Sequence, residues 1–353
     1  MNDISPFLKQ LLSLPGLSGN EAPVRDLIMQ KWQPLVDEIS VSKLGSLHAL
    51  RHANQKNAPS ILLAAHMDAI GLIVTGIQDG FLRVTEIGGV DPRILPGQVV
   101  TVHSRRELPG IAVLWPDRLV NPDHKGKSPV LGRILVDIGL PTAEVNALVR
   151  VGDLISFASQ PMDLTGNALA GHTLDNRASV AALTLCLQEL QKVNLDWNLW
   201  AVATVQEEVT LAGAATSPYA ITPDMVVAVD VTFAKGPGVS DYRAITMDKG
   251  PAIGIGANIH PFMHKKFKET AEEFEIPYSI EALPKSSGTD AIYMQIVGSG
   301  IPCAVIGIPL RYMHTPVEEV VLTDIQRTGH LLAAFVKNLE LDTLELLARE
   351  MRP

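Results

Sequence analysis

The sequence feature that most constrains the fold is a stretch from about residue 72 to 164 in which short β-type runs follow one another closely. These runs are LIVTGIQDG, FLRVTEIGG, QVVTVHS, GIAVLW, RILVDIG and LISFAS. Gly, Pro and Asp residues separate them, and closely spaced strands with such turns are typical of a small β-barrel or sandwich. We therefore predict a β-rich, barrel-like unit over residues 72–164.

Outside this stretch, predicted strands alternate with predicted helices. Apolar residues at helical spacing predict helices over residues 4–15, 22–38, 176–192, 263–275 and 322–347. Short apolar runs predict strands over residues 61–65, 197–205, 225–232 and 303–308. Ser18 or Asn20 is predicted to cap the second helix. The alternation favours an α/β fold with a mainly parallel mixed sheet flanked by helices. We predict one α/β domain, residues 1–71 and 165–353, interrupted by the inserted domain at residues 72–164.

The composition excludes several classes of protein. The chain has 353 residues, 46% hydrophobic and 19% charged, which is typical of a globular protein and not of a disordered or collagen-like one. With 29 basic and 38 acidic side chains the net charge is −9, so we expect no binding to nucleic acid or to an anionic membrane. The sequence has no apolar run long enough for a transmembrane helix and no signal-peptide pattern. We expect Cys186 and Cys303 to be reduced core thiols of a cytoplasmic protein.

Side chains of the types that bind metal ions stand at or just after the ends of predicted strands. They lie in the segments AAHMDAIG (64–71), GHTLDNRAS (171–179), VQEEVTLAGA (205–214), VVAVDVT (226–232) and MHTPVEE (313–319). Ligand sites in open α/β sheets collect at the carboxyl ends of strands. The candidate ligands are His66, Asp175, Glu207, Glu208, Asp230 and His314. Imidazoles and carboxylates without a thiolate suit zinc, cobalt or manganese rather than a closed structural zinc site.

Each of these pieces also has an ordinary structural interpretation. His66 could be a core histidine bonded to Asp68, and His314 could be a loop histidine. The acidic residues are harder to explain in this way. Glu207 and Glu208 directly follow an apolar strand, and Asp230 has apolar neighbours on both sides, so uncompensated carboxylates would be costly at these positions.

The ordered set His-x-Asp, Asp-Asn-Arg, Glu-Glu, Asp and His resembles the motifs of the co-catalytic dimetal aminopeptidases. In detail it resembles the M42 family, which includes glutamyl and tetrahedral (TET-type) aminopeptidases. The resemblance covers essentially the whole chain, including the β-rich insert after the segment 66–68, the segment SSGTDA (286–291) and the closing segment HTPVE (314–318). It implies a zinc-peptidase-like fold in which the α/β domain is the catalytic domain.

The resemblance also implies a set of metal ligands. Asp175 would bridge two divalent metal ions. His66 and Asp230 would be the other ligands of the first ion, and Glu208 and His314 would be the other ligands of the second. Two adjacent cations need such a bridging carboxylate because they otherwise repel each other strongly.

The implied reaction is the removal of N-terminal residues from short peptides by a metal-bridged water. Glu207 would be the general base that takes a proton from this water, and Asp68 would accept a hydrogen bond from the His66 imidazole and fix its tautomer. The two ions are expected to be zinc or cobalt, with manganese as a further candidate. The family further implies a homo-oligomer, in many members a tetrahedral dodecamer.

The sequence departs from the family pattern after the glutamate pair. Thr210 and Ala212 stand where many members have Gly and Arg, which leaves the ligands intact but changes the loop. His172, three residues before Asp175, has no counterpart in the pattern and is predicted to lie in a pocket or beside the ligands.

Two other functions are compatible with parts of the sequence. A glycoside hydrolase would use two of the carboxylates, but it has no need for His66, Asp230 and His314, and only 5% of the residues are aromatic. A metal-binding oligomeric scaffold could have lost catalysis through the altered loop at 210–212. The complete ligand set together with Glu207 argues against this second alternative.

Overall fold

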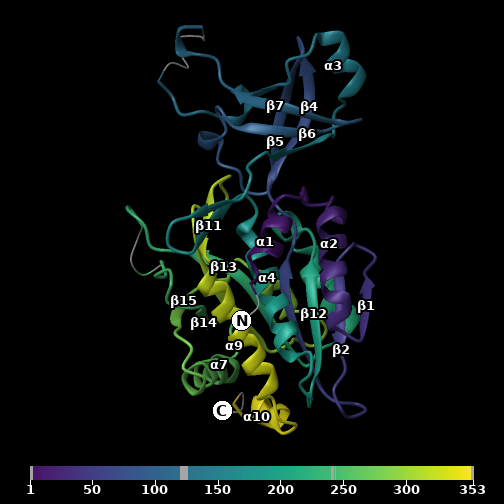
Figure 1. The fold of residues 1–353 in the computed structure, drawn as a ribbon, viewed down its shortest axis with the longest axis vertical. Coiled ribbons are helices and arrows are strands. Elements are labelled where there is room, and N and C mark those ends of the chain that lie inside the picture. The colour runs from purple at the N-terminus through teal and green to yellow at the C-terminus, as the bar shows by residue number, and fades with distance from the viewer. Residues whose placement is uncertain (1–2, 120–125, 240–241, 243, 351–353) are drawn as a thin grey trace.

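The computed structural model describes residues 3–119, 126–239, 242 and 244–350. It confirms the α/β fold, with a mixed sheet flanked by helices and a closed β-barrel (Figure 1). The barrel stands at one end of the long axis of the molecule, and the helix α10 (Thr343–Glu350) lies at the other end.

In the described part of the chain, eleven strands form the large sheet. They are β1 (Glu38–Val41), β2 (Leu47–Arg51), β3 (Ser60–His66), β10 (Met162–Leu164), β11 (Ala168–Gly171), β12 (Asn198–Thr204), β13 (Met225–Phe233), β14 (Ala252–Gly256), β15 (Ser279–Leu283), β16 (Cys303–Arg311) and β17 (Glu318–Val321). The order along the main path is β1-β2-β12-β3-β13-β16-β17-β11-β10, and β14 pairs with β16 and β15. The four strands predicted from apolar runs, β12, β3, β13 and β16, form the parallel centre. Antiparallel pairs flank this centre.

The helices pack on both faces of this sheet. They are α1 (Ser5–Leu12), α2 (Ala22–Trp32), α4 (Leu174–Leu190), α5 (Glu207–Thr210), α6 (Ala212–Ile221), α7 (Pro261–Glu273), α8 (Ala291–Met294), α9 (Leu322–Lys337) and α10. The second predicted helix is shorter than 22–38, because Gln33–Leu35, with Pro34 inside it, forms a 3₁₀ turn. The predicted helix over 322–347 is divided into α9 and α10.

The predicted cap of the second helix is wrong. Helix α2 begins after Glu21, which makes no side-chain capping bond. The Ser18 hydroxyl instead donates a hydrogen bond of 2.5 Å to Asp68 Oδ2, fifty residues away. The Ser18 side chain therefore makes a tertiary contact instead of a local helix cap, and the local sequence does not predict this contact.

Alternation along the central strands divides their side chains between two apolar cores. Odd-numbered residues of β3 pack with α1, α2, α4, α7 and α9, whereas Leu62 and Ala64 pack on the side of α6 and α8. Ala228 of β13 belongs to this second core as well. Because side chains alternate with a period of two, His66 and Asp230 continue the same series and point to the same face.

All six β-type runs between residues 72 and 164 become strands of the closed barrel. The strands are β4 (Gly71–Gln78), β5 (Phe81–Ile87), β6 (Val99–His103), β7 (Glu107–Val113), β8 (Leu135–Asp137) and β9 (Leu154–Phe157), in the order β4-β5-β8-β7-β6-β9. The barrel encloses its own apolar core and carries one helix that was not predicted, α3 (Thr142–Leu148). The exact domain boundaries at residues 72 and 164 stay a prediction.

Two further sequence features can be compared with the structure. Cys186 and Cys303 are both buried and unpaired, as expected of core thiols. Among the described residues, every helix is too short or too polar to span a bilayer.

Candidate metal centre

The candidate ligands converge from separate elements at the carboxyl edge of the parallel strands. His66 is the last residue of β3 and lies in register with Thr204, the last residue of β12. Glu207 and Glu208 follow at the start of α5. Asp230 belongs to β13. Two further ligands arrive from neighbouring loops and helices, namely Asp175 near the start of α4 and His314 after β16.

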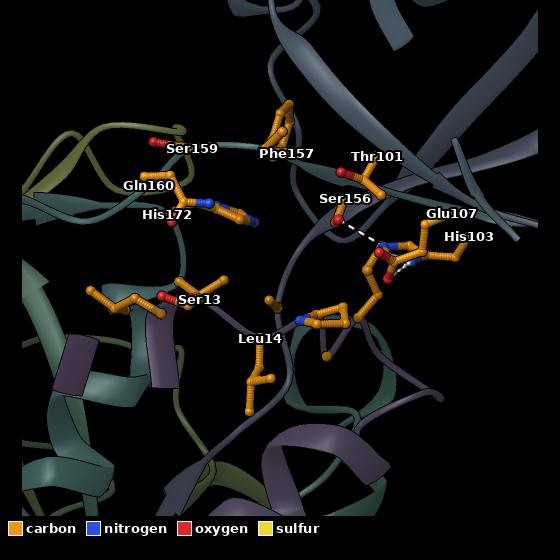
Figure 2. A pocket seen from close by; sticks show the side chains of 17 residues that line it. Ser13, Leu14, Thr101, His103, Glu107, Ser156, Phe157, Ser159, Gln160 and His172 are labelled. Carbon is orange, nitrogen blue, oxygen red and sulfur yellow. Dashed lines mark hydrogen bonds and ion pairs between the residues drawn. The ribbon is translucent and has the colours of Figure 1, made fainter. Parts of the chain in front are cut away.

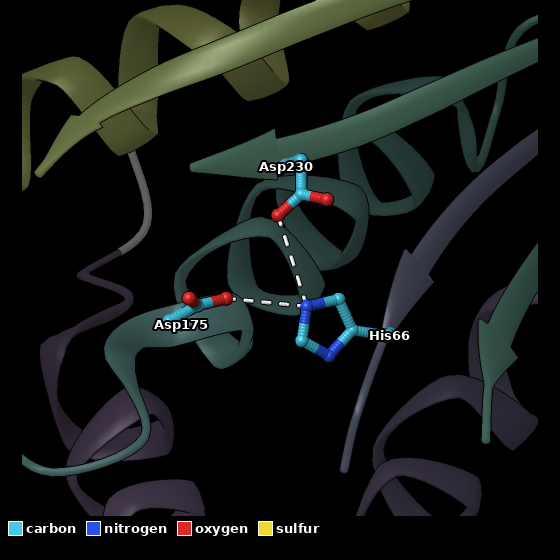
Figure 3. Close-up of side chains that lie close together, drawn as sticks. All are labelled: His66, Asp175 and Asp230. Carbon is cyan, nitrogen blue, oxygen red and sulfur yellow. Dashed lines mark ion pairs between the residues drawn. The ribbon is translucent and has the colours of Figure 1, made fainter. Parts of the chain in front are cut away.

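Two groups of these side chains could each hold a metal ion, and Asp175 belongs to both. In the first group, His66 Nε2 lies 3.2 Å from Asp175 Oδ1 and 3.8 Å from Asp230 Oδ1 (Figure 3). In the second group, His314 Nε2 lies 3.4 Å from Asp175 Oδ2 and 3.5 Å from Glu208 Oε2. The two oxygens of one carboxylate therefore face two different imidazoles.

The orientation of each imidazole leaves its Nε2 atom directed at the carboxylates. On His314, Nδ1 lies 3.0 Å from the carbonyl oxygen of Gly89, to which an Nδ1–H would donate. On His66, Nδ1 lies 3.3 Å from the Asp68 carbonyl oxygen and 3.5 Å from Asp68 Oδ1. A hydrogen bond from Nδ1 to an oxygen is the usual way in which a metal-binding histidine keeps Nε2 unprotonated.

The carboxylates and imidazoles of the cluster shift one another's pKa values strongly. Burial, followed by the charges of neighbouring acids, raises the pKa of Glu207 to about 9 and raises the pKa of Glu208 and Asp230 well above the usual range. Burial would lower the pKa of His66, but Glu207 and other carboxylates raise it well above its usual value. The hydrogen bond to Asp175 raises the pKa of His314 to about 9. Buried acids of this kind are stabilised by cations, so the donor set fits divalent metal ions.

Two buried carboxylates hold the backbone of the ligand-bearing segments. Asp68 Oδ1 accepts a hydrogen bond of 3.0 Å from the Glu207 amide, and Oδ2 accepts one of 3.2 Å from the Glu208 amide. Glu318 accepts one from the Asp175 amide and one from the His314 amide, each at 3.0 Å. The sequence analysis did not identify Glu318 as a functional residue. Its position four residues after His314, in the segment 314–318, could have indicated a role beside that ligand.

A cavity of about 390 Å³ opens onto the cluster and is lined by the five residues of the two ligand groups and by Glu207. Thr210 and Ala212, the two departures from the family pattern, are not among its lining residues, and Thr210 is exposed. The cavity also reaches Glu281 on β15, a residue that no sequence motif indicated.

His172 lies in a different cavity, of about 210 Å³, between the α/β domain and the barrel (Figure 2). Figure 2 shows it across this space from His103, Glu107 and Ser156 of the barrel strands. The His172 ring packs edge-on against Phe157, with ring centroids 4.9 Å apart. Burial, together with the nearby Arg177 charge, lowers the pKa of His172 to about 3. The prediction of a pocket residue is therefore correct, but the pocket is separate from the cluster.

An α/β sheet with clustered imidazoles and carboxylates at the ends of its parallel strands is typical of metal-dependent α/β enzymes. Residues 45–331 match the family described as M42 glutamyl aminopeptidase. The chain belongs to this family, and its activity is therefore that of an aminopeptidase, a hydrolase.

Individual relatives agree with this assignment over nearly the whole chain. A lysyl aminopeptidase of Pyrococcus furiosus is 36% identical over 341 residues, which cover 95% of this chain and 97% of the relative. The aminopeptidase APDkam598 of Desulfurococcus kamchatkensis has a similar structure, with a TM-score of 0.90, 34% identity and 98% of each chain covered. The TET1 peptidase of Pyrococcus horikoshii, described as assembling into a tetrahedron or a large octahedral shell, has a TM-score of 0.84 and 28% identity, covering 96% of this chain and 100% of that one.

The comparisons favour neither of the two other functions considered from the sequence. The matching family and these relatives are named as peptidases, whereas two other similar solved structures are named as an endoglucanase and as a putative peptidase/endoglucanase. The family match is to the aminopeptidases.

Proposed function

We propose that this chain is a dinuclear metallo-aminopeptidase that removes N-terminal residues from short peptides. The proposal rests on the position of Asp175, which belongs to both groups of possible metal ligands. One of its carboxylate oxygens faces His66 and the other faces His314. One ion would be held by His66, Asp175 and Asp230, and the other by Asp175, Glu208 and His314. Two dications so close together require a shared anionic ligand.

The two ions, when bound, would acidify the attacking water and polarise the scissile carbonyl. Zinc and cobalt suit the donor set best, and manganese is a further candidate. The four carboxylates of Asp175, Glu207, Glu208 and Asp230 would together offset the charge of two dications.

Glu207 is the proposed general base. Its Oε2 atom lies 3.8 Å from His66 Nε2, in the same cavity as the ligands, but Glu207 is not a member of either ligand group. It would take a proton from the attacking water and deliver it to the leaving amine. Asp68 would support this step indirectly, because its carboxylate fixes the Glu207 and Glu208 amides and faces the Nδ1 side of His66.

The test is hydrolysis of aminoacyl p-nitroanilides by protein stripped with a chelator and reloaded with zinc, cobalt or manganese. We expect metal-dependent release from substrates with a free α-amine and none from their N-acetylated counterparts. Metal-dependent cleavage of blocked or internal bonds would contradict an aminopeptidase, and equal cleavage by stripped protein would contradict the metal requirement.

We further propose that the protein is a cytoplasmic homo-oligomer and that its assembly is the tetrahedral dodecamer. One solved TET1 structure is described as a dodecamer, and a second TET1 structure is described as a tetrahedron or a large octahedral shell. Light scattering coupled to size exclusion should then give twelve times the mass of the 38.1 kDa chain. A monomer at micromolar concentration would contradict this assembly.

The names of the relatives disagree about which N-terminal residue is removed. The family is described as glutamyl, and the Pyrococcus furiosus relative as lysyl. Membership of the family therefore leaves the preference open, and it must be sought in the cavity of this chain.

A further inference from the structure

Five acidic side chains line the cavity of the metal centre, and Glu281 is the one to which the proposed function assigns no role. It lies on β15, and its carboxylate is bonded to the hydroxyl of Thr232 on β13. Thr232 is two residues beyond Asp230 and points to the same face of the strand. At a rise of about 3.3 Å per residue, the two positions are roughly 7 Å apart along the strand.

The room beside this carboxylate exists because residue 307 is a glycine. A Cβ atom at Gly307 would lie 3.1 Å from Glu281 Oε2 and 2.9 Å from Thr232 Cγ2. Gly307 itself lines the cavity. Any larger residue at this position would therefore press on the carboxylate and reduce the space in front of it.

The charge of Glu281 has no counterpart in the cavity. Among the described residues, the lining of this cavity includes no lysine and no arginine, and Glu281 makes no ion pair. The four other carboxylates would offset two divalent ions, which leaves Glu281 in excess. Burial raises the pKa of the Glu281 carboxyl, so a cation placed beside it would favour the charged form.

The lining of the cavity also includes apolar side chains. Leu283 of β15 and Val305 of β16 both line the cavity. A lysine side chain has a four-carbon apolar stem and a terminal charge, so it can cover apolar walls while its ammonium reaches a carboxylate. Arginine combines an apolar stem and a charged end in a similar way.

We propose that Glu281 is a specificity-determining residue that selects peptides beginning with lysine or arginine. The inference rests on the proposed function, because the metal centre would hold the free α-amine and the scissile carbonyl while the side chain extends toward Glu281. An N-terminal glutamate is disfavoured by the same geometry, since it would place two carboxylates together.

The first test compares, by calorimetry, the binding of L-lysinamide and L-norleucinamide to metal-loaded Glu207→Gln protein, in which hydrolysis of the two amides is suppressed. The two ligands share the α-amine and the four-carbon stem and differ in the terminal ammonium. A charge-assisted hydrogen bond corresponds to roughly 10- to 100-fold in affinity, so we expect lysinamide to bind tighter by this factor. When Glu281→Gln, which keeps the shape and removes the charge, is added to this protein, the ratio should approach one. The matched control is Glu269→Gln on the exposed face of α7, which changes the net charge equally and should leave the ratio unchanged.

The second test measures kcat/KM on lysyl, arginyl, leucyl and glutamyl p-nitroanilides. We expect lysyl and arginyl substrates to be preferred and the lysyl-to-leucyl ratio to fall about 10-fold or more in Glu281→Gln. Preference for leucyl or glutamyl substrates, or an unchanged ratio in Glu281→Gln, would overturn the inference and leave the aminopeptidase intact. If no substrate is cleaved, the proposed function fails, and the amide pair still decides the role of Glu281. Equal binding of both amides, or binding of neither, overturns it.

Discussion

At the scale of single residues, Glu207 and Glu208 are neighbours in the chain with different surroundings. Glu208 faces His314 and Asp175, whereas Glu207 faces His66 from outside both ligand groups. We predict that Glu207→Gln lowers kcat by about 10²- to 10⁴-fold, the usual contribution of a general base, and keeps the metal content near that of the wild type. Activity assays paired with elemental analysis check both parts.

The contrasting variant is Asp175→Asn, which should lose metal as well as activity. The neutral amide cannot serve two cations as a charged bridge. A normal metal stoichiometry in Asp175→Asn would contradict the bridging role of Asp175. Near-normal turnover in Glu207→Gln would show that Glu207 is not the general base.

His172 gives a prediction about stability and pH. Its pKa is about 3 in the folded protein and near 6.5 in the unfolded chain, because burial disfavours the charged ring. Between about pH 6.5 and pH 3 the unfolded state therefore binds more protons, and stability falls as the pH falls, by up to about 1.4 kcal/mol per pH unit. Above pH 6.5 both states are neutral at this residue and the contribution is constant.

The measurement is urea unfolding of metal-free protein from pH 7.5 down to pH 5, compared with His172→Gln. The metal-free form avoids the proton release that accompanies metal binding. The variant should show a shallower loss of stability over this range. Parallel curves for the two proteins would show that His172 has the same pKa in the folded and unfolded states, and a shallower curve for the wild type would show that it is protonated when folded.

At the scale of secondary-structure elements, the packing of α4 against α9 depends on Gly329. A Cβ atom at this position would lie 2.7 Å from Leu185 Cβ and 2.8 Å from the Ala182 carbonyl oxygen, both on α4. Gly329→Ala should gain up to about 1 kcal/mol in helix propensity and still destabilise the protein, by about 1–3 kcal/mol, through overpacking. Denaturation with urea or heat measures the change. Gln326→Ala, on the half-exposed side of the same helix, is the control and should not destabilise the protein. If Gly329→Ala instead stabilised the protein, α4 and α9 would be able to move apart at little cost.

The elements also show which parts of the fold could be predicted. The central strands are continuous apolar runs because both faces are buried, and the sequence located them within a few residues. The flanking strands β1, β10 and β15 are short or largely exposed and carry no such signal. The ligand-bearing turns depend on left-handed backbone at Thr173, Gln206 and His314, which residue type does not favour.

At the scale of the whole molecule, metal binding should couple to global stability. The ligands come from β3, β13, α4, α5 and the loop after β16, so an unfolded chain offers no preformed site. A ligand present at 1,000 times its dissociation constant stabilises the folded state by about 4 kcal/mol. We predict that a chelator lowers the melting temperature of the protein and that zinc, cobalt or manganese restores it.

Magnesium at the same concentration is the control, because it prefers oxygen ligands and should restore less. Calorimetric melting curves of stripped and reloaded protein make the comparison. Identical curves before and after chelation would contradict a centre built from five parts of the fold.

The α/β class, the barrel insert and the candidate ligands could be predicted from the sequence alone, because strand periodicity, turn residues and ligand types are local properties. Which side chains contact one another depends on the folded chain. The Gly89 carbonyl beside the barrel orients His314, Glu318 ties two ligand segments together, and Glu281 reaches the cavity from a strand with no ligand of its own. These contacts join residues that are distant in the sequence or on separate elements. The packing of the helices and strands determines these contacts, and no local sequence pattern predicts them.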